Sequence, residues 1–262
     1  MTKHADGPLI EMLQVHKTFA NGTEAIRDMA LSINPGEFVS FLGPSGCGKS
    51  TALKMIAGLL SASAGTIRVH GHAPGEGAET GEIGYVFQEA TLMPWANVFD
   101  NVFLPLRLRG LSRKAAKEQV SAVLAQVGLS KFHNSYPREL SGGMKMRVSI
   151  ARALVTEPEL LLLDEPFAAL DEITRFKLNN DVLRLWEENN LTVVFVTHSV
   201  FESVYMSSRV VVMGARPGRV VEEIDLPPAT GRTDEYRTSS QFGDNARIVT
   251  QALGRTMQDV DH

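Results

Sequence analysis

Short apolar runs bounded by glycine or polar residues recur along this 262-residue chain. Residues 38–42, 160–163 and 192–196 are almost wholly apolar, as in strands that are buried on both faces of a parallel sheet. Residues 9–15 alternate only in part, which favours a strand with one face on the core. Further strands are predicted at 30–33, 66–70, 84–88 and 209–213. Strands that alternate with helical segments predict an α/β fold.

The middle of the chain, from about residue 89 to 157, differs because strand-like runs stop there. Residues 112–127 predict an amphipathic helix with Ser112 as its N-cap. Two apolar segments that contain proline, 93–95 and 104–106, are expected to be irregular, and they fit either an interface or packing within their own subdomain. Helices are also predicted at 145–154, 176–189 and 201–207.

Two stretches are predicted to be loosely held. Residues 71–81 are rich in glycine and predict a flexible connection. Beyond Pro228 the sequence is polar and rich in turn-forming residues, with one amphipathic stretch near 246–253. We therefore expect residues 226–262 to form a peripheral, partly mobile tail.

The strand at 38–42 runs into a glycine-rich turn and then a helical pattern, and this turn carries chemistry. The sequence matches the spacing G-x-x-x-x-G-K-[ST] of a phosphate-binding loop in its strand, loop and helix context. Glycines let backbone N–H groups converge on phosphate oxygens, and the helix start adds positive charge. Lys49 is expected to reach the β- and γ-phosphates, and the Ser50 hydroxyl to bind Mg²⁺. The predicted nucleotide-binding residues of this loop are Gly43, Pro44, Ser45, Gly46, Cys47, Gly48, Lys49, Ser50 and Thr51.

Two carboxylates, Asp164 and Glu165, follow the buried run at 160–163. They therefore lie at the carboxyl end of a central strand, where open α/β sheets bind ligands. Asp164 is placed to hold the Mg²⁺ shell, and Glu165 to polarise an attacking water. Adjacent acids usually mark a solvated loop, but acids that end a fully apolar strand favour a function.

Four further positions have two interpretations from the residues alone. Phe19 fits either a stacking partner for a purine base or the core. Gln88 fits either a Mg²⁺ or water ligand or a loop residue. Ser141-Gly142-Gly143 begins a helix and forms either a second anion site or a linker fragment. His198 fits either a sensor of the γ-phosphate or a structural histidine.

Composition and charge exclude several classes. The net charge of −4 argues against a broadly basic surface for nucleic acid, although it leaves room for a local basic patch. The single cysteine, Cys47, excludes an intrachain disulfide and is interpreted as structural. No apolar run approaches the length of about 18 residues that spans a membrane, and residues 1–8 contain no apolar signal segment. The protein is therefore expected to stay in the cytoplasm.

With these motifs in this order, the chain resembles the ATP-binding subunit of an ABC transporter over residues 9–225. The resemblance rests on the phosphate loop, Gln88, the signature Leu-Ser-Gly-Gly-Met at 140–144, the run 160–165, residues 168–171 and His198. The signature separates this family from kinases and GTPases. The resemblance implies a P-loop NTPase (RecA-like) core with an antiparallel β subdomain, in a nucleotide-binding domain over 1–225. A helical subdomain is inserted over about 90–157, and the tail 226–262 follows.

The resemblance also implies a role for each open position. Phe19 falls where the family stacks adenine, and Gln88 where it links Mg²⁺ to the membrane partner. The family works as a head-to-tail pair, so Ser141, Gly142 and Gly143 would contact the γ-phosphate that a second copy holds. The implied catalytic residues are Glu165, His198 and Lys49, and the implied Mg²⁺ ligands are Ser50, Gln88 and Asp164.

Three positions depart from the commonest residues of the family. Met144 replaces Gln, Ala168 replaces Ser and Ser199 replaces Asp, but none of these changes removes a catalytic group. An active ATPase is therefore expected. Met144 and the segments 92–95 and 216–219 are similar to the branch that imports nitrate, sulfonate and taurine.

The implied function is that of the ATP-hydrolysing subunit of an importer. Such a subunit uses ATP and Mg²⁺ and drives solute uptake through separate membrane permease subunits, at the cytoplasmic face of the inner membrane. A solute-binding protein would take part indirectly, and no nucleic acid partner is expected. The alternative is a soluble ABC-type ATPase. A small-molecule kinase would leave the signature and His198 without roles, and Glu165 argues against a degenerate regulatory subunit.

Overall fold

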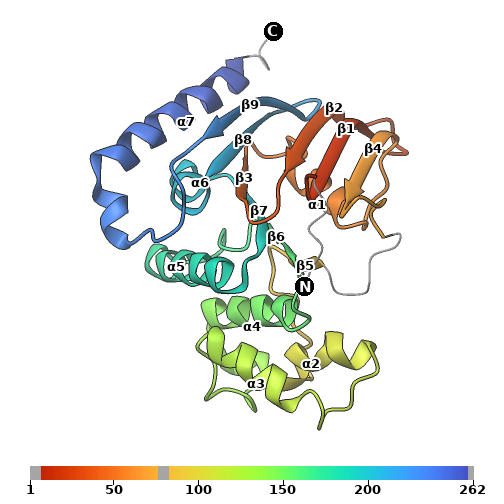
Figure 1. The fold of residues 1–262 in the computed structure, drawn as a ribbon, viewed down its shortest axis with the longest axis vertical. Coiled ribbons are helices and arrows are strands. Elements are labelled where there is room, and N and C mark those ends of the chain that lie inside the picture. The colour runs from red at the N-terminus through yellow and green to blue at the C-terminus, as the bar shows by residue number, and fades with distance from the viewer. Residues whose placement is uncertain (1–6, 76–82, 259–262) are drawn as a thin grey trace. The chain divides into compact units, whose positions relative to one another are not determined.

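The computed structural model describes residues 7–75 and 83–258, and these fall into two compact units. The terminal unit, Met1–Ala78 with Thr192–His262, contains both ends of the chain and is red to orange and blue in Figure 1. The middle unit, Glu79–Leu191, runs from yellow to teal. The predicted connection at 71–81 falls partly outside the described residues. Each unit is therefore best understood from its own strands and helices.

The terminal unit contains a three-stranded antiparallel sheet in the order β2-β1-β4. Its strands are β1 (Ile10–Thr18), β2 (Glu24–Ile33) and β4 (Ala64–Val69). Side chains alternate between the core and the surface, as expected for a strand with one covered face. The predicted antiparallel β subdomain is present in this sheet.

A second sheet of the terminal unit has the order β7-β3-β8-β9. Its strands are β3 (Phe38–Leu42), β7 (Thr192–Thr197), β8 (Arg209–Gly214) and β9 (Arg219–Asp225). β3 pairs in parallel with both β7 and β8, and every side chain of β3 and β7 is buried. This explains the two apolar runs, because a central parallel strand is covered on both faces. Helices α1 (Lys49–Ile56) and α6 (Val200–Met206) follow β3 and β7.

The segment after Leu226 differs from the peripheral tail that the sequence predicted. It forms the short 3₁₀ helix η2 (Asp234–Thr238) and then α7 (Ser240–Gln258), which packs on α6 and β8. Val249 and Ala252 of α7 are fully buried. Arg232, which precedes η2, donates to the carbonyl oxygens of Val204 and Tyr205, both at 2.8 Å, in the last turn of α6. The buried face of α7 makes this segment part of the terminal unit.

The middle unit combines one parallel strand pair with four helices. β5 (Ile83–Val86) pairs with β6 (Leu160–Asp164), whose side chains are all buried. The helices are α2 (Val98–Leu108), α3 (Lys117–Gln126), α4 (Gly142–Leu154) and α5 (Glu172–Asn189), with the 3₁₀ helix η1 (Pro137–Glu139) before α4. Among the described residues, no helix is both long and apolar enough to span a membrane.

Three helix predictions differ from the structure in the middle unit. Residues 104–106 are not irregular, because Pro105 lies inside α2. α3 begins at Lys117 rather than at residue 112, since the Ser112 hydroxyl caps a separate turn by accepting from the N–H of Ala115 at 3.2 Å. α5 begins at Glu172, before the predicted start, because the Asp171 carboxylate caps it by accepting from the N–H of Thr174 at 2.9 Å.

Candidate functional site

The loop between β3 and α1 has the backbone that the phosphate-loop motif predicts. Gly46 and Gly48 have φ of 80° and 89°, which side chains other than glycine rarely adopt. Lys49 is only 4% exposed, and its ammonium donates to the carbonyl oxygens of Gly43 at 2.8 Å and Pro44 at 3.0 Å. The loop thus holds a buried cation against its own backbone. A phosphate oxygen that replaced either carbonyl would make a stronger, charge-assisted bond.

Cys47 packs on the inner side of this loop. Its side chain is fully buried, and burial raises the pKa of the thiol. The Sγ atom lies 3.8 Å from Nζ of Lys49. Because the side chain is fully buried, the structure agrees with the interpretation of Cys47 as a structural residue of the loop.

The turn between β8 and β9 packs against the backbone of the phosphate loop. The N–H of Gly218 donates to the carbonyl of Ala25 at 3.0 Å, and the carbonyl of Gly218 accepts from the N–H of Arg27 at 2.9 Å. A Cβ atom on Gly218 would lie 2.2 Å from the carbonyl oxygen of Cys47. From the sequence, residues 216–219 were notable only for their similarity to one importer branch of the family. The packing of this turn on the phosphate loop had no signal in the sequence, because the contact joins distant backbone segments.

His198 leaves the sheet beside the phosphate loop. In the parallel pairing of β3 with β7, Leu42 lies opposite Thr197, so Gly43 and His198 follow at the same edge. The Thr197 hydroxyl donates to the buried Glu202 carboxylate and accepts from the N–H of Ser199 at 3.0 Å. These bonds fix the turn that carries His198, whose side chain is exposed. The structure therefore brings the phosphate loop and His198 together.

Phe19 lies in the turn between β1 and β2. Its ring is 39% exposed, and Nζ of Lys17 lies 5.4 Å from the ring centroid. The turn leads into Ala25 and Ile26, which lie so close to Gly48 that a Cβ there would be 2.5 Å from Cδ1 of Ile26. An exposed ring on a segment anchored at the phosphate loop is available for stacking on a planar ligand.

The middle unit places two carboxylates and an amide at the carboxyl ends of its two strands. Val86 pairs with Leu163, so Gln88 and Asp164 follow neighbouring strands at one edge. Asp164 is 7% exposed, and its carboxylate accepts from the Tyr85 hydroxyl at 3.1 Å. Glu165 is half-buried with φ of 45°, a backbone conformation that is uncommon outside glycine and often marks functional sites.

Tyr85 is a site residue that the sequence did not reveal. Burial raises the pKa of its phenol, and the charge of Asp164 and the hydrogen bond to it act in the same direction. The phenol therefore remains a donor that holds the buried carboxylate in place. Only the register between β5 and β6 brings the two side chains together, and a sequence pattern does not give register.

The signature segment begins α4. The Ser141 side chain accepts from the N–H of Met144 at 3.3 Å, so Ser141 caps the helix that the sequence predicted to begin here. Gly143 is buried, and a Cβ on it would lie 2.6 Å from the methyl group of Thr174 on α5. Gly142 is exposed. The first glycine thus leaves the helix N-terminus open to a ligand, whereas the second allows close packing within the unit.

The predicted Mg²⁺ ligands are chemically suitable for that ion. The hydroxyl of Ser50, the amide of Gln88 and the carboxylate of Asp164 all offer oxygen, and Mg²⁺ prefers a few such ligands completed by water and phosphate. In the part of the chain that the structure describes, no group of three or more His, Cys, Asp or Glu side chains could hold a metal alone.

Replacing Gly218 with Ala would push a methyl group into the phosphate loop. We expect the affinity for ATP to fall about tenfold, because the loop must shift to relieve the contact with Cys47. Titration with a fluorescent ATP analogue would measure the affinity of each variant. The matched control is Gly243→Ala, since a Cβ there meets open space. Equal affinities of the two variants would contradict the supporting role of Gly218.

Replacing Tyr85 with Phe would remove the donor to Asp164. We expect the free energy of unfolding at neutral pH to fall by about 1–3 kcal/mol, as for other hydrogen bonds to charged groups. Because the pKa of Tyr85 is raised in the folded state, its contribution is fully present below the unfolded pKa of about 10 and declines as pH rises above it. Urea unfolding should show a wild-type advantage that shrinks above about pH 10, and an unchanging difference would argue against this assignment.

Known proteins with similar sequences and folds support one family. The sequence model of the ABC transporter family matches residues 26–168, more than half of the chain. A taurine import ATP-binding protein of Rhizobium johnstonii is 41% identical over 244 residues, which cover 91% of this chain and 92% of that protein. An aliphatic sulfonates import ATP-binding protein of Bacillus cereus is 42% identical over 226 residues, covering 84% and 88%.

A solved structure agrees with these relatives. It is a dimeric ATP-binding cassette in a post-hydrolysis state, bound to ADP and phosphate. The TM-score is 0.74 with 33% sequence identity, and the match covers 83% of this chain and 99% of that one. Together with the phosphate loop, the strand-end carboxylates and the capped signature helix, these similarities show that the chain belongs to the ABC transporter family of ATP-binding proteins.

Proposed function

We propose that this protein is the ATP-hydrolysing subunit of an importer for a small anion or related solute of the nitrate, sulfonate and taurine type. The observation that carries the proposal is the carboxyl end of β6, where Tyr85 holds the buried Asp164 and Glu165 follows. Membership of a family of transport ATPases gives these acids a reaction. The solute class is supported by the names of the sulfonate and taurine relatives.

The phosphate loop and Lys49 bind the nucleotide. Lys49 exchanges its bonds to the carbonyls of Gly43 and Pro44 for bonds to the β- and γ-phosphates, without leaving its buried position. The Phe19 ring stacks on the adenine. When Mg²⁺ is bound through Ser50, Gln88 and Asp164, it neutralises charge on the phosphates.

Glu165 acts on the water that attacks the γ-phosphate. Its carboxylate orients this water and accepts a proton from it, which makes the oxygen a better nucleophile. His198 and Lys49 stabilise the charge on the γ-phosphoryl group as its bond to the bridging oxygen breaks and ADP leaves. The turn beside Thr197 fixes His198 before the substrate arrives, so little reorganisation is needed.

A second copy of the chain completes the site. Ser141 caps α4, and the exposed Gly142 leaves the positive end of this helix accessible. In a head-to-tail pair, this end of one copy meets the γ-phosphate that the other copy holds. Hydrolysis removes the contacts that favour closure, and the pair opens.

Replacing Glu165 with Gln tests the catalytic assignment. The amide keeps the shape of the side chain but cannot accept the proton, so we expect ATP turnover to fall at least about 100-fold while ATP binding persists. ATP turnover and nucleotide affinity should be measured together, with the oligomeric state recorded with and without Mg·ATP.

The control for this variant is Glu159→Gln, which removes one exposed carboxylate just before β6. It should turn over ATP within about twofold of the wild type, as surface substitutions usually do. A Glu165→Gln protein that hydrolyses ATP as fast as the wild type would make both the assignment and the mechanism wrong.

A groove in the middle unit, lined by both apolar and charged residues, is our candidate for the site that receives the membrane permease subunits at the cytoplasmic face of the membrane. It has a volume of about 430 Å³, and Trp95 at its edge is 77% exposed. An exposed tryptophan beside a groove is typical of a protein interface. The groove is lined by Met93, Trp95, Ala96, Asp100, Phe103, Leu104, Arg107 and Arg113.

Replacing Trp95 with Ala should uncouple transport from hydrolysis. We expect solute uptake in vesicles that also contain the permease subunits to fall at least about tenfold, because interface tryptophans often contribute 2 kcal/mol or more. ATP turnover by the isolated protein should be unchanged, since Trp95 is a surface side chain and has no assigned role at the nucleotide. Leu59→Ala, which truncates a 59% exposed side chain of the terminal unit, is the control.

The outcomes of this experiment separate the alternatives. Loss of uptake and turnover together would contradict the docking assignment. If pull-down from detergent-extracted membranes recovers no permease with the wild-type protein, the alternative of a soluble ABC-type ATPase would be favoured.

A further inference from the structure

Positive charge is concentrated in the part of the chain predicted as the helical subdomain. Residues 90–157 contain ten Lys and Arg against four Asp and Glu, a net charge of +6, whereas the whole chain has −4. Five of these cations fall within residues 107–117, and no acid lies between them. Residues 107–117 therefore form a locally basic segment, which the net charge of −4 did not exclude.

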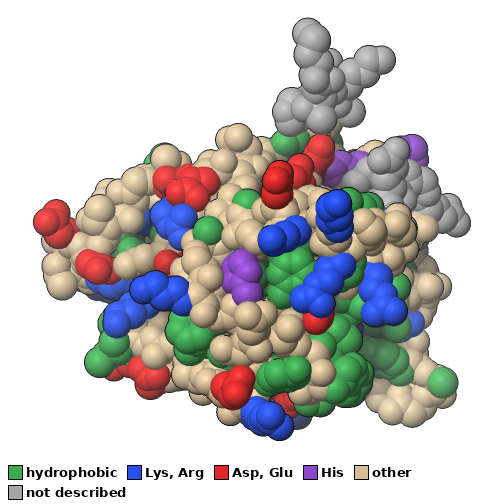
Figure 2. Space-filling view, turned by 90° about the horizontal axis from the view of Figure 1, so that it is seen from below, with side chains coloured by type: hydrophobic (Ala, Val, Ile, Leu, Met, Phe, Trp, Pro, Cys, Tyr) green, Lys and Arg blue, Asp and Glu red, His purple; other side chains and the backbone are tan. Residues whose placement is uncertain are grey.

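The basic segment borders a shallow pocket whose lining has no carboxylate. The pocket has a volume of about 530 Å³ and lies between the ends of α2 and α3 and the segment after α3. Figure 2 shows Lys and Arg side chains gathered beside hydrophobic ones on the face drawn. Every residue of the lining offers either a hydrogen-bond donor or an aromatic ring. The lining residues are Phe99, Arg113, Lys114, Lys117, Ser121, His133 and Asn134.

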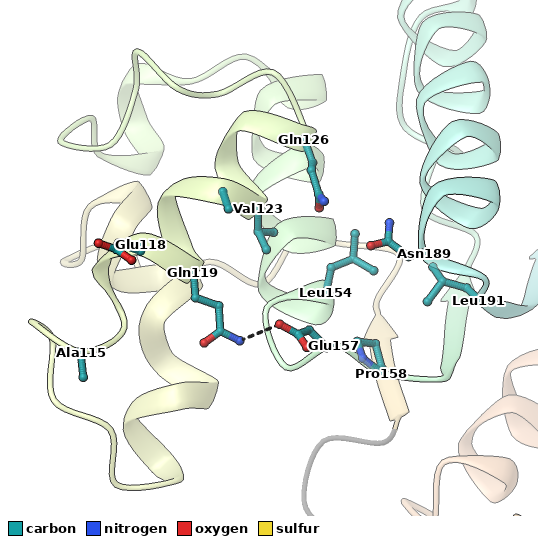
Figure 3. A pocket seen from close by; sticks show the side chains of 11 residues that line it. Ala115, Glu118, Gln119, Val123, Gln126, Leu154, Glu157, Pro158, Asn189 and Leu191 are labelled. Atoms are coloured by element: carbon teal, nitrogen blue, oxygen red, sulfur yellow. Dashed lines mark hydrogen bonds between the residues drawn. The ribbon is translucent and has the colours of Figure 1, made fainter. Parts of the chain in front are cut away.

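Glu118, the carboxylate that follows Lys117 in sequence, lines a different pocket. Glu118 lines a pocket of about 690 Å³ on the other side of α3, together with Gln119 and Glu157 (Figure 3). There the Gln119 amide donates to the carbonyl of Val155 at 2.8 Å and lies 3.4 Å from the Glu157 carboxylate. α3 thus presents acid and amide groups to one pocket, while Lys117 at its start lines the other. Glu118 is therefore not part of the lining of the cationic pocket, which contains no carboxylate.

Arg113 is held in position for an incoming anion. Its guanidinium lies over the Phe99 ring at 4.7 Å from the centroid and pairs with Asp100 at 3.1 Å. Its side chain is still 57% exposed, so further donors remain available. Among the residues that the structure describes, no carboxylate lies within ion-pair distance of Lys114 or Lys117.

We propose that this pocket binds an oxyanion of the phosphate or sulfonate class. The planar guanidinium of Arg113 can bind two oxygens at once, and the two ammonium groups add charge without a fixed geometry. The Ser121 hydroxyl and the Asn134 amide supply neutral donors, and the Phe99 ring offers an apolar surface to an organic substituent. None of these residues has a role in ATP hydrolysis, and only Arg113 also lines the groove proposed for the permease, so an anion site here goes beyond the proposed function.

The same chemistry has two sources, a free anion and the headgroup of an anionic lipid. Leu108, between Arg107 and Arg109, is 80% exposed, which suits a surface that meets lipid. A free anion would need only the pocket. Both sources require Lys114 and Lys117, and the experiment below separates them.

The test uses the full chain with ADP present at saturation, so that the phosphate loop is occupied. Calorimetric titration with inorganic phosphate measures the free anion. Co-sedimentation with vesicles of phosphatidylcholine, alone or mixed with phosphatidylglycerol, measures the lipid. The variant is Lys114→Gln with Lys117→Gln, and we expect its binding to be about 25-fold weaker, since each cation near an anionic surface strengthens binding about fivefold.

The control variant removes two exposed cations elsewhere, Lys54→Gln with Lys177→Gln. It makes the same change in net charge and should bind like the wild type. ATP turnover of both double variants should match the wild type, which shows that they are folded and separates this test from that of the proposed function.

Each outcome decides the proposal. Phosphate binding that only the Lys114 and Lys117 variant loses supports a site for a free anion. Binding only to the phosphatidylglycerol vesicles, lost in the same variant, supports a lipid headgroup. If neither probe binds, or if the two double variants behave alike, the proposal is overturned.

Discussion

The backbone behind the phosphate loop leaves no room for side chains, and the arrangement of the terminal unit depends on this constraint. A Cβ on Gly218 would lie 2.2 Å from the carbonyl oxygen of Cys47, and one on Gly48 would lie 2.9 Å from that of Ala25, so three segments distant in sequence approach one another through their backbones. A loop that must present its N–H groups to phosphate needs such support, because glycine-rich backbone is otherwise free to move. The antiparallel sheet and the β8–β9 turn therefore have a part in the site although neither contributes a catalytic side chain.

The second constraint is the cost of placing a carboxylate at the end of a fully buried strand. β6 gives Asp164 little access to water, and an unpaired charge in such a place would be strongly destabilising. The Tyr85 phenol, on the neighbouring strand β5, reduces this cost by donating a hydrogen bond to the Asp164 carboxylate. The bond also limits the orientations of the carboxylate, and this is useful to a group that is proposed to hold an ion at a fixed distance from a nucleotide.

The sequence predicted those parts of the fold and site that depend on local patterns. The central strands followed from apolar runs, the phosphate loop from glycine and lysine spacing, and the cap at Ser141 from its helix start. Contacts between distant segments had no such signal, as Tyr85 with Asp164 and Gly218 with Cys47 show. The apolar face of α7 was visible as a short amphipathic stretch, but the turn-rich residues before it concealed that it packs on α6.

Arg232 links the C-terminal part of the chain to α6, the helix that follows His198. Its guanidinium supplies donors to backbone carbonyls of the last turn of α6, and α6 begins directly after the turn that carries His198. A chain shortened before Arg232 would leave those carbonyls without these donors and would expose the buried face of α6. The loss would loosen the last turn of α6, the helix that begins two residues after His198, so a truncation before Arg232 acts on the element that follows the histidine and not only on the cut end.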